Sequence, residues 1–142
     1  MEKNMEENFK KLKERVKDSL NNTDTERINY ELQKLSKTTL ISGVGGSSVV
    51  SLFASRILEK SNHIITRCIE PRDMNYINSW HYDNVMACSY SGNNYGVELA
   101  FDNNLKKYLL SSGEYNSDDV INLEYKCNDP EKSFISLAAT LI

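Results

Sequence analysis

Residues 38–58 read TTLISGVGGSSVVSLFASRIL and carry the clearest indication of the fold. Its first five residues, 38–42, are mostly β-branched or apolar, which is typical of a strand. The glycine-rich turn 43–48 follows at once, and the apolar segment 49–58 then has the pattern of a helix. The sequence therefore predicts a strand, a tight turn and a helix. Because segment 49–58 is apolar over most of its circumference, we expect it to be buried on more than one side.

The rest of the chain repeats this alternation of strands and helices. Residues 63–69 have the continuous apolar and β-branched character of a strand covered on both faces, and Pro71 closes it. The remaining predicted elements follow in chain order: a loop or short helix over 72–80, a strand over 85–88, a helix over 93–104 with Val97, Ala100 and Phe101 inward, strands over 107–110 and 120–125, and a helix after Pro130. This alternation predicts an α/β domain with a mostly parallel, five-stranded sheet flanked by helices.

The order of the strands decides where a site can form. In the common flavodoxin-like order 2-1-3-4-5, the strands over 38–42 and 85–88 are neighbours, and the winding reverses between their carboxyl ends. This order places the turn 43–48, the first loop, beside residues 89–94, the second loop. Both loops then face one small crevice.

Two helices precede the sheet. An amphipathic helix with one apolar stripe is indicated by residues that recur every three or four positions: Met5, Phe9, Leu12, Val16 and Leu20. Thr23 with Glu26 three residues later forms the capping-box pattern that begins a second helix. We expect residues 1–36 to pack on the domain or at a subunit interface, and residues 37–142 to form the α/β domain.

Composition limits the classes of partner. The 142 residues suffice for one domain with a real core, and 17 basic against 20 acidic residues give no reason to expect nucleic acid or a membrane surface as partner. No apolar run approaches a membrane span or a secretory signal. Cys68, Cys88 and Cys127 lack the close spacing of a metal site. We therefore expect free thiols in a cytoplasmic protein, with no metal and no cofactor.

The second loop reads SYSGNN and stands between a strand and a helix. The N–H groups in the first turn of a helix have no partner inside the helix, and the helix dipole adds partial positive charge there. Such a turn suits an anion. Serine hydroxyls add donors, and Gly92 lets the backbone come close to a ligand.

The first loop has three interpretations when it is considered alone. A Walker A loop is excluded, because no lysine precedes Ser47. A dinucleotide fingerprint would need a third glycine where Ser48 stands, although Glu70 at the end of the second strand could bind a ribose. A purely structural turn, which only lets the strand enter the helix, is the third interpretation.

Taken together, the two loops resemble those of a known family. GVGGS at 43–47 after one strand and SYSG at 89–92 after a later strand are similar to the paired phosphate loops of SIS domains, the sugar isomerase domains that bind phosphosugars. The resemblance runs from about Ile28 to Ile142, and the second loop is its more specific part. It implies a five-stranded parallel sheet flanked by helices, usually in a dimer or larger assembly. Within the family, the chain resembles the first SIS domain of a glucosamine-6-phosphate-synthase-like protein or a related sugar-phosphate isomerase.

The resemblance also implies which residues bind the ligand. The set comprises Gly45, Gly46, Ser47, Ser89, Tyr90, Ser91, Gly92, Asn94 and Ser136. Within it, Ser47 and the two serines of the second loop are expected to hold the phosphate, and Ser136 to contact the sugar. Tyr90 stands where many members have glutamine, so its main-chain N–H would serve instead. Asn94 stands where many have a phosphate-binding threonine, and its amide can donate to the same oxygen.

The catalytic base is the least specified part of the site. Aldose–ketose isomerisation needs a base near C1 and C2 of the opened sugar. Phosphoheptose isomerases of this fold carry a glutamate in the helix after the first loop, where this chain has Arg56-Ile57, which argues against that activity. Glu131 at the carboxyl edge of the sheet is a better candidate base than Glu98, and a solvated or helix-capping glutamate is the alternative interpretation. His63 opens the second predicted strand and His81 precedes the third, so both histidines are expected at the opposite end of the sheet.

The leading hypothesis is a sugar-phosphate isomerase domain, of the aldose–ketose or aminosugar type, that binds a small phosphorylated sugar and assembles as a homodimer or larger homo-oligomer. A non-catalytic sensor of the same ligand is the alternative, and a nicotinamide-dinucleotide-binding domain is the third hypothesis. The apolar pattern of the last predicted helix stops at Ile142 without a cap. This indicates a domain truncated at its carboxyl end, which could be inactive on its own.

Overall fold

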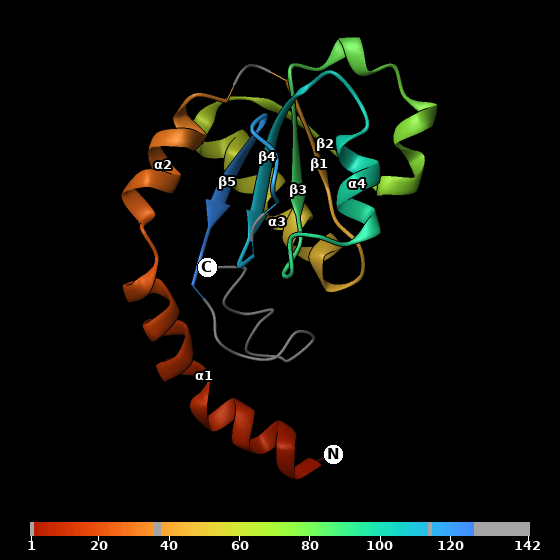
Figure 1. The fold of residues 1–142 in the computed structure, drawn as a ribbon. Helices are drawn as coiled ribbons and strands as arrows, with labels where there is room; N and C mark the ends of the chain where they lie inside the picture. Colours follow the sequence, from red (N-terminus) through yellow and green to blue (C-terminus); the bar gives the residue numbers. More distant parts are fainter. Residues whose placement is uncertain (1, 36–37, 114, 127–142) are drawn as a thin grey trace.

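The computed structural model describes residues 2–35, 38–113 and 115–126. Strands and helices alternate along the chain, as the sequence predicts (Figure 1). The elements are α1 (Glu2–Asn22), α2 (Thr25–Gln33), β1 (Thr38–Ser42), α3 (Gly46–Asn62), β2 (Ile65–Ile69), the 3₁₀ helices η1 (Pro71–Tyr76) and η2 (Ser79–His81), β3 (Asn84–Cys88), α4 (Tyr95–Phe101), β4 (Lys106–Ser111) and β5 (Val120–Glu124). None of the described helices is long and apolar enough to cross a membrane. The helix predicted after Pro130 lies outside the described residues.

The five strands form one sheet in the order β2-β1-β3-β4-β5, and every neighbouring pair is parallel. The prediction of an α/β fold with a five-stranded parallel sheet in the flavodoxin-like order is therefore confirmed. Ser42, the last residue of β1, pairs with Ala87 near the end of β3. The two strands thus end side by side, and the two loops leave them at the same edge of the sheet.

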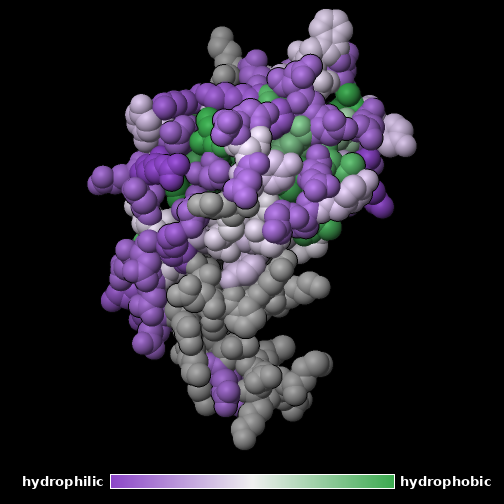
Figure 2. All heavy atoms as spheres, viewed as in Figure 1, coloured by the Kyte–Doolittle hydropathy of each residue, from purple (hydrophilic) through white to green (hydrophobic). Residues whose placement is uncertain are grey.

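Alternate residues of each strand point to opposite faces of the sheet and build two apolar layers. On one face, a cluster around Ile41 and Met86 packs against α3. On the other face, the packing residues of α4 are those predicted from its spacing: Val97, Ala100 and Phe101. Right-handed crossovers put α3 and α4 on opposite faces, because β2 and β4 lie on opposite sides of the β1–β3 pair. Polar and charged side chains cover most of the surface seen in Figure 2, with smaller apolar areas between them.

The exposure of β2 differs from its prediction. It is an edge strand, as the predicted order has it, but it is not covered on both faces, since Ile65 is 68% exposed and Cys68 is exposed too. It begins at Ile65, because His63 ends α3 in a left-handed conformation with φ 55°. A β-branched composition identifies a strand, but it does not show whether other elements cover both faces of that strand.

The exposure of α3 also differs from its prediction. The helix begins at Gly46, so the serines of the first loop lie in its first turn. Its buried residues are Val50, Ser51, Ser55 and Leu58. Four large apolar side chains of the same helix are 45% to 54% exposed: Val49, Leu52, Phe53 and Ile57. The expected burial on more than one side is therefore wrong for the described part of the chain.

The start of α2 is set by Asp24 and not by the predicted capping box. The Asp24 carboxylate accepts a hydrogen bond from the Arg27 N–H at 3.0 Å and satisfies one free donor of the first turn. The Thr23 hydroxyl instead donates to the Ser19 carbonyl (2.7 Å) and accepts from the Lys126 N–H (2.9 Å). Thr23 thus links the turn between α1 and α2 to the chain just after β5, the strand on which α2 packs.

Asp24→Ala removes the cap of α2 and should lower the free energy of unfolding by about 1 kcal/mol, the usual contribution of an N-cap side chain. Urea unfolding followed by circular dichroism measures this loss. Glu26→Ala is the control, since Glu26 in the first turn contributes only a favourable interaction with the helix dipole and should cost less. Equal losses for the two variants would contradict the assignment of Asp24 as the cap.

Candidate functional site

Two glycines shape the first loop. Gly43 follows β1 and is buried, and a Cβ atom there would lie 2.4 Å from the carbonyl oxygen of Ser47. Gly45 has φ 60° and is the N-cap residue of α3. A side chain is therefore excluded at the first position and strained at the second. Glycine at both allows β1 to enter α3 through a very short turn.

The first turn of α3 carries the serines of this loop. Ser48 donates both its N–H (3.0 Å) and its hydroxyl (2.6 Å) to the Gly45 carbonyl, and the Ser47 N–H bonds the carbonyl three residues back (3.1 Å). The Ser47 hydroxyl and the N–H groups of Gly45 and Gly46 make no hydrogen bond to any described residue. These donors are unpaired at the start of a 17-residue helix, where the helix dipole favours an anion.

Ser89 organises the second loop from inside. It is 2% exposed, and its hydroxyl oxygen accepts hydrogen bonds from the Gly92 N–H (3.1 Å) and from Nδ2 of Asn94 (2.9 Å). Its own N–H donates to the Leu110 carbonyl of β4 at 3.1 Å. A hydroxyl that accepts twice still has a proton to donate. Ser89 therefore holds the loop together and keeps one donor.

Asn94 joins the second loop to α4. Its Oδ1 accepts a hydrogen bond from the Val97 N–H at 3.0 Å and caps the helix, while its Nδ2 donates to Ser89. Asparagine is among the best N-cap residues for this reason. The family resemblance implies a phosphate contact for Asn94, whereas in the structure both polar ends of its side chain have a partner within the chain.

The end of β4 supports the second loop, and the sequence analysis missed it. The hydroxyls of Ser111 and Ser112 both donate to the Tyr90 carbonyl, at 3.0 and 2.8 Å. Gly113 packs so closely on the loop that an added Cβ atom would lie 2.0 Å from the Ser91 carbonyl oxygen. A signal for this support is present in the sequence, since serines and a glycine stand at the end of β4. Because β4 is the parallel neighbour of β3, the two strands end at the same edge of the sheet, and these residues lie beside the second loop.

Ser91 presents the most accessible serine hydroxyl of the second loop. Its side chain is partly exposed, and its Oγ makes no hydrogen bond within the described part of the chain. Gly92 beside it has φ 79°, and an added Cβ atom there would lie 2.7 Å from Oγ of Ser111. The loop is thus closely packed underneath, with Ser91 at its surface.

A small hollow lies beside the first loop. It has a volume of about 130 Å³ and is lined by Gly43, Ser48, Ser51, Cys68, Ile69 and Glu70. Because β2 and β3 flank β1 on opposite sides, this hollow lies on the side of the first loop away from the second. On the other side, the first loop touches the start of α4, where a Cβ atom added to Gly96 would lie 3.2 Å from Cγ2 of Val44.

The other candidate residues are more dispersed. Glu98 is exposed in the first turn of α4. His81 stacks on Trp80 before β3, and His63 follows α3 before β2. Both histidines therefore lie at the amino-terminal edge of the sheet, away from the loops, as predicted. Three residues lie outside the described residues: Cys127, Glu131 and Ser136.

Cys88 ends β3 immediately before the second loop. It is 3% exposed, and burial raises the pKa of its thiol to about 12. The thiol is therefore protonated at neutral pH and cannot serve there as a nucleophile. The described residues contain no group of three His, Cys, Asp or Glu side chains placed to hold a metal ion.

Comparison with known proteins yields structural neighbours. No family model and no curated protein matches the chain. A Listeria monocytogenes protein described as a candidate sugar-phosphate isomerase superposes with a TM-score of 0.72 at 11% identity, over 98% of this chain and 82% of that one. Escherichia coli tagatose-6-phosphate ketose/aldose isomerase superposes with a TM-score of 0.70 at 17% identity, over 96% of this chain and 45% of that one. Vibrio vulnificus NanR, solved in complex with ManNAc-6P, superposes with a TM-score of 0.66 at 14% identity, over 96% of this chain and 56% of that one.

This chain has the fold of an SIS domain. The resemblance carried by the two loops is confirmed at the level of the fold, since similarity at such low identity shows a shared fold and not a shared activity. The chain spans about half the length of the E. coli and V. vulnificus proteins. What those proteins bind or convert therefore comes to this chain only as a proposal.

Two substitutions separate the two roles of Asn94 in the SIS fold. Asn94→Ser keeps a capping oxygen but is too short to reach Ser89, and we expect the free energy of unfolding to fall by about 1 kcal/mol. Asn94→Ala removes both interactions and should cost about 2 kcal/mol. Urea unfolding measures both losses. A variant Asn94→Ser as stable as the native protein would show that the bond to Ser89 contributes nothing.

The thiols adjoining the site should differ in reactivity. Iodoacetamide at neutral pH is expected to modify the exposed Cys68 and to leave Cys88 intact until the chain is unfolded, because a buried thiol with a pKa of about 12 is almost wholly protonated. Peptide mass spectrometry of native and urea-treated samples distinguishes the two residues. Modification of both at one rate in the native protein would mean that the end of β3 is open to solvent.

Proposed function

We propose that this domain binds a small phosphorylated sugar through the first and second loops. The observation that carries the proposal is the pairing of β1 with β3, since it brings the two loops to neighbouring strand ends. These loops carry the hydroxyls of Ser47 and Ser91, which have no hydrogen-bond partner among the described residues. The same fold occurs in a tagatose-6-phosphate isomerase and in NanR with bound ManNAc-6P, which supports a phosphosugar as the class of ligand.

A phosphate can bind to these loops without a lysine or an arginine. α3 supplies its dipole and the unpaired N–H groups of Gly45 and Gly46. Ser47 and Ser91 donate from the two loops, and Ser89 donates the proton that its two accepted bonds leave available. Hydrogen bonds to an ionised acceptor are stronger than neutral ones, so a few such donors suffice for a phosphate.

For the reaction we propose aldose–ketose or aminosugar isomerisation, in which a base moves a proton between C1 and C2 of the opened sugar. Glu131 is the proposed base and Ser136 the proposed sugar contact, and both lie outside the described residues. Glu98, exposed in α4, is the described alternative for the base. The E. coli neighbour is an isomerase of a ketose and an aldose phosphate, which supports this choice of reaction.

A sensor without turnover is the second candidate function. NanR has the same fold and was solved with ManNAc-6P bound, and its name states no reaction. Incubation of the protein with fructose 6-phosphate or glucosamine 6-phosphate, followed by analysis of the sugars, separates the two candidates. Conversion of a bound sugar supports the isomerase, and binding without conversion supports the sensor.

A nicotinamide dinucleotide is the third candidate, and the geometry supports it least. The hollow beside the first loop measures about 130 Å³, whereas ligand pockets usually measure roughly 300–1,000 Å³. Glu70, which would bind the ribose, forms an ion pair with Arg72 at 2.9 Å. A dinucleotide would therefore have to break this pair and widen the hollow.

Assembly as a homodimer or larger homo-oligomer is also part of the proposal. Val49 and Leu52 are 54% and 52% exposed on α3, and grouped exposed apolar side chains mark interaction surfaces. Sedimentation of the native protein over a range of concentrations tests the oligomeric state. The cytoplasmic location stays a prediction.

Thermal-shift titration with fructose 6-phosphate and glucosamine 6-phosphate tests the binding of phosphosugars. A ligand that binds only the native state raises Tm with its concentration. Ser47→Ala and Ser91→Ala each remove one donor to a charged phosphate, and each should weaken binding about 10-fold or more.

Ser61→Ala is the matched control for Ser47→Ala, because Ser61 is an exposed serine in the last turn of the same helix. It lies about 20 Å from Ser47 along the helix axis and should leave binding unchanged. The proposal is contradicted if no sugar phosphate stabilises the protein, or if Ser61→Ala weakens binding as much as Ser47→Ala. Stabilisation by NAD alone would favour the dinucleotide.

A further inference from the structure

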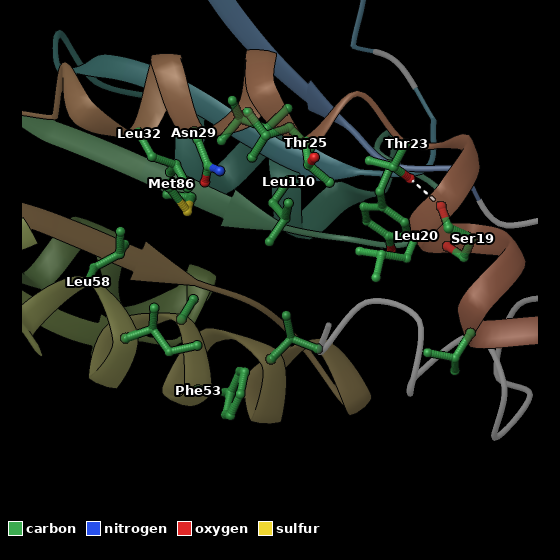
Figure 3. A pocket seen from close by; sticks show the side chains of 17 residues that line it. Ser19, Leu20, Thr23, Thr25, Asn29, Leu32, Phe53, Leu58, Met86 and Leu110 are labelled. Atoms are coloured by element: carbon green, nitrogen blue, oxygen red, sulfur yellow. Dashed lines mark hydrogen bonds between the residues drawn. The ribbon is translucent and has the colours of Figure 1, made fainter. Parts of the chain in front are cut away.

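An apolar groove separate from the two loops runs between α2 and α3. It has a volume of about 340 Å³, and none of its lining residues belongs to either loop. Figure 3 shows side chains of the sheet, Met86 and Leu110, in the space between the two helices, with Leu32 of α2 beside them. Phe53 of α3 also lines the groove and is 46% exposed. An open apolar surface of this kind is unfavourable in water unless something covers it.

The width of the groove follows from the strands that lie beneath it. On this face of the sheet, α3 packs on β1, β2 and β3, and α2 packs on β5. The sheet residues that line the groove come from three adjacent strands: Met86 of β3, Leu110 of β4 and Leu123 of β5. Neighbouring strands lie about 4.8 Å apart and a helix with its side chains is about 10 Å across, so the space between α2 and α3 accepts one further helix.

The chain leaves the sheet at the rim of this groove. Tyr125, the residue after β5, lines the groove. Lys126 is fixed to the turn between α1 and α2, since its N–H donates to the Thr23 hydroxyl at 2.9 Å and its carbonyl accepts from the Ser19 hydroxyl. The 16 residues 127–142 follow Lys126 in the sequence. They therefore start directly beside the groove.

Residues 130–142 read PEKSFISLAATLI and have the pattern of an amphipathic helix. Proline is favoured in the first turn of a helix. Lys132, Ser136 and Thr140 recur every four residues and form one polar stripe, and the other positions from Phe134 onward are apolar. A helix of 13 residues is about 20 Å long, close to the length of a six-residue strand.

We propose that residues 130–142 form a helix whose apolar side fills the groove of the same chain. The apolar lining, the width of one helix and the position of Lys126 at the rim all support this occupant. The polar stripe, which includes Ser136, then faces away from the sheet, so this packing is an alternative to the sugar contact proposed for Ser136. In this packing α3 gains a neighbour along Phe53. A second copy of this chain laid across the groove is the competing occupant.

Cross-linking of the full-length chain tests the proposal. In a Cys68→Ser, Cys127→Ser background, Ala54→Cys in the groove lining is combined with Ala138→Cys on the apolar side of the segment. A short bismaleimide should then give an intrachain product, identified by peptide mass spectrometry. Arg56→Cys with Ala138→Cys is the matched control, because Arg56 is exposed on α3 and does not line the groove. An interchain product for the first pair, or equal intrachain yields for the two pairs, would overturn the proposal.

A second measurement separates packing of the segment from mere proximity. Leu141→Asp places a charge on the apolar side of the segment and should lower Tm by about 10 °C, whereas Thr140→Asp on the polar stripe should change it little. Equal Tm values for the two variants would contradict burial of this segment. Neither measurement depends on a sugar phosphate, so the proposal stands or fails independently of the ligand.

Discussion

The parallel pairing of β1 with β3 is the constraint on which the candidate site depends. It brings two loops to one edge of the sheet, and the positions of β2 and β4 on opposite sides of the pair send α3 and α4 to opposite faces. The two loops then contribute different chemistry. The start of α3 offers a helix dipole with N–H groups that no described residue pairs, whereas the second loop offers serine hydroxyls on a short, tightly bonded turn.

The second loop is organised before any ligand arrives. Ser89 ties it from inside, and Ser111 and Ser112 hold the Tyr90 carbonyl from the end of β4. Because these groups are already fixed by hydrogen bonds, the free energy of binding includes little cost for ordering them. The arrangement divides the serines into those that support the loop and those, such as Ser91, whose hydroxyl has no hydrogen-bond partner among the described residues. Sequence composition alone could not make this division, since all of them are serines in a turn.

The elements and both loops could be predicted because they depend on local patterns: apolar strands, glycine turns and helical periodicity in regular alternation. The strand order could be predicted because it is the common one for this alternation. Features that depend on contacts between residues far apart in the sequence could not be predicted in this way. The exposure of Ile65 depends on which elements cover the faces of β2, and the half-exposed Phe53 and Ile57 of α3 line the groove beside that helix. The cap of α2 was misassigned because Thr23 and Asp24 are both good N-cap residues, and the contact of Thr23 with Lys126, more than 100 residues away, decides between them.

In the proposed binding mode, one phosphate is held between the ends of β1 and β3. The most direct measurement is a crystal structure of the protein with bound glucosamine 6-phosphate. We expect phosphate oxygens within hydrogen-bonding distance of the hydroxyls of both Ser47 and Ser91, about 2.5–3.0 Å. A phosphate bound elsewhere, such as in the hollow beside Glu70, would contradict this binding mode.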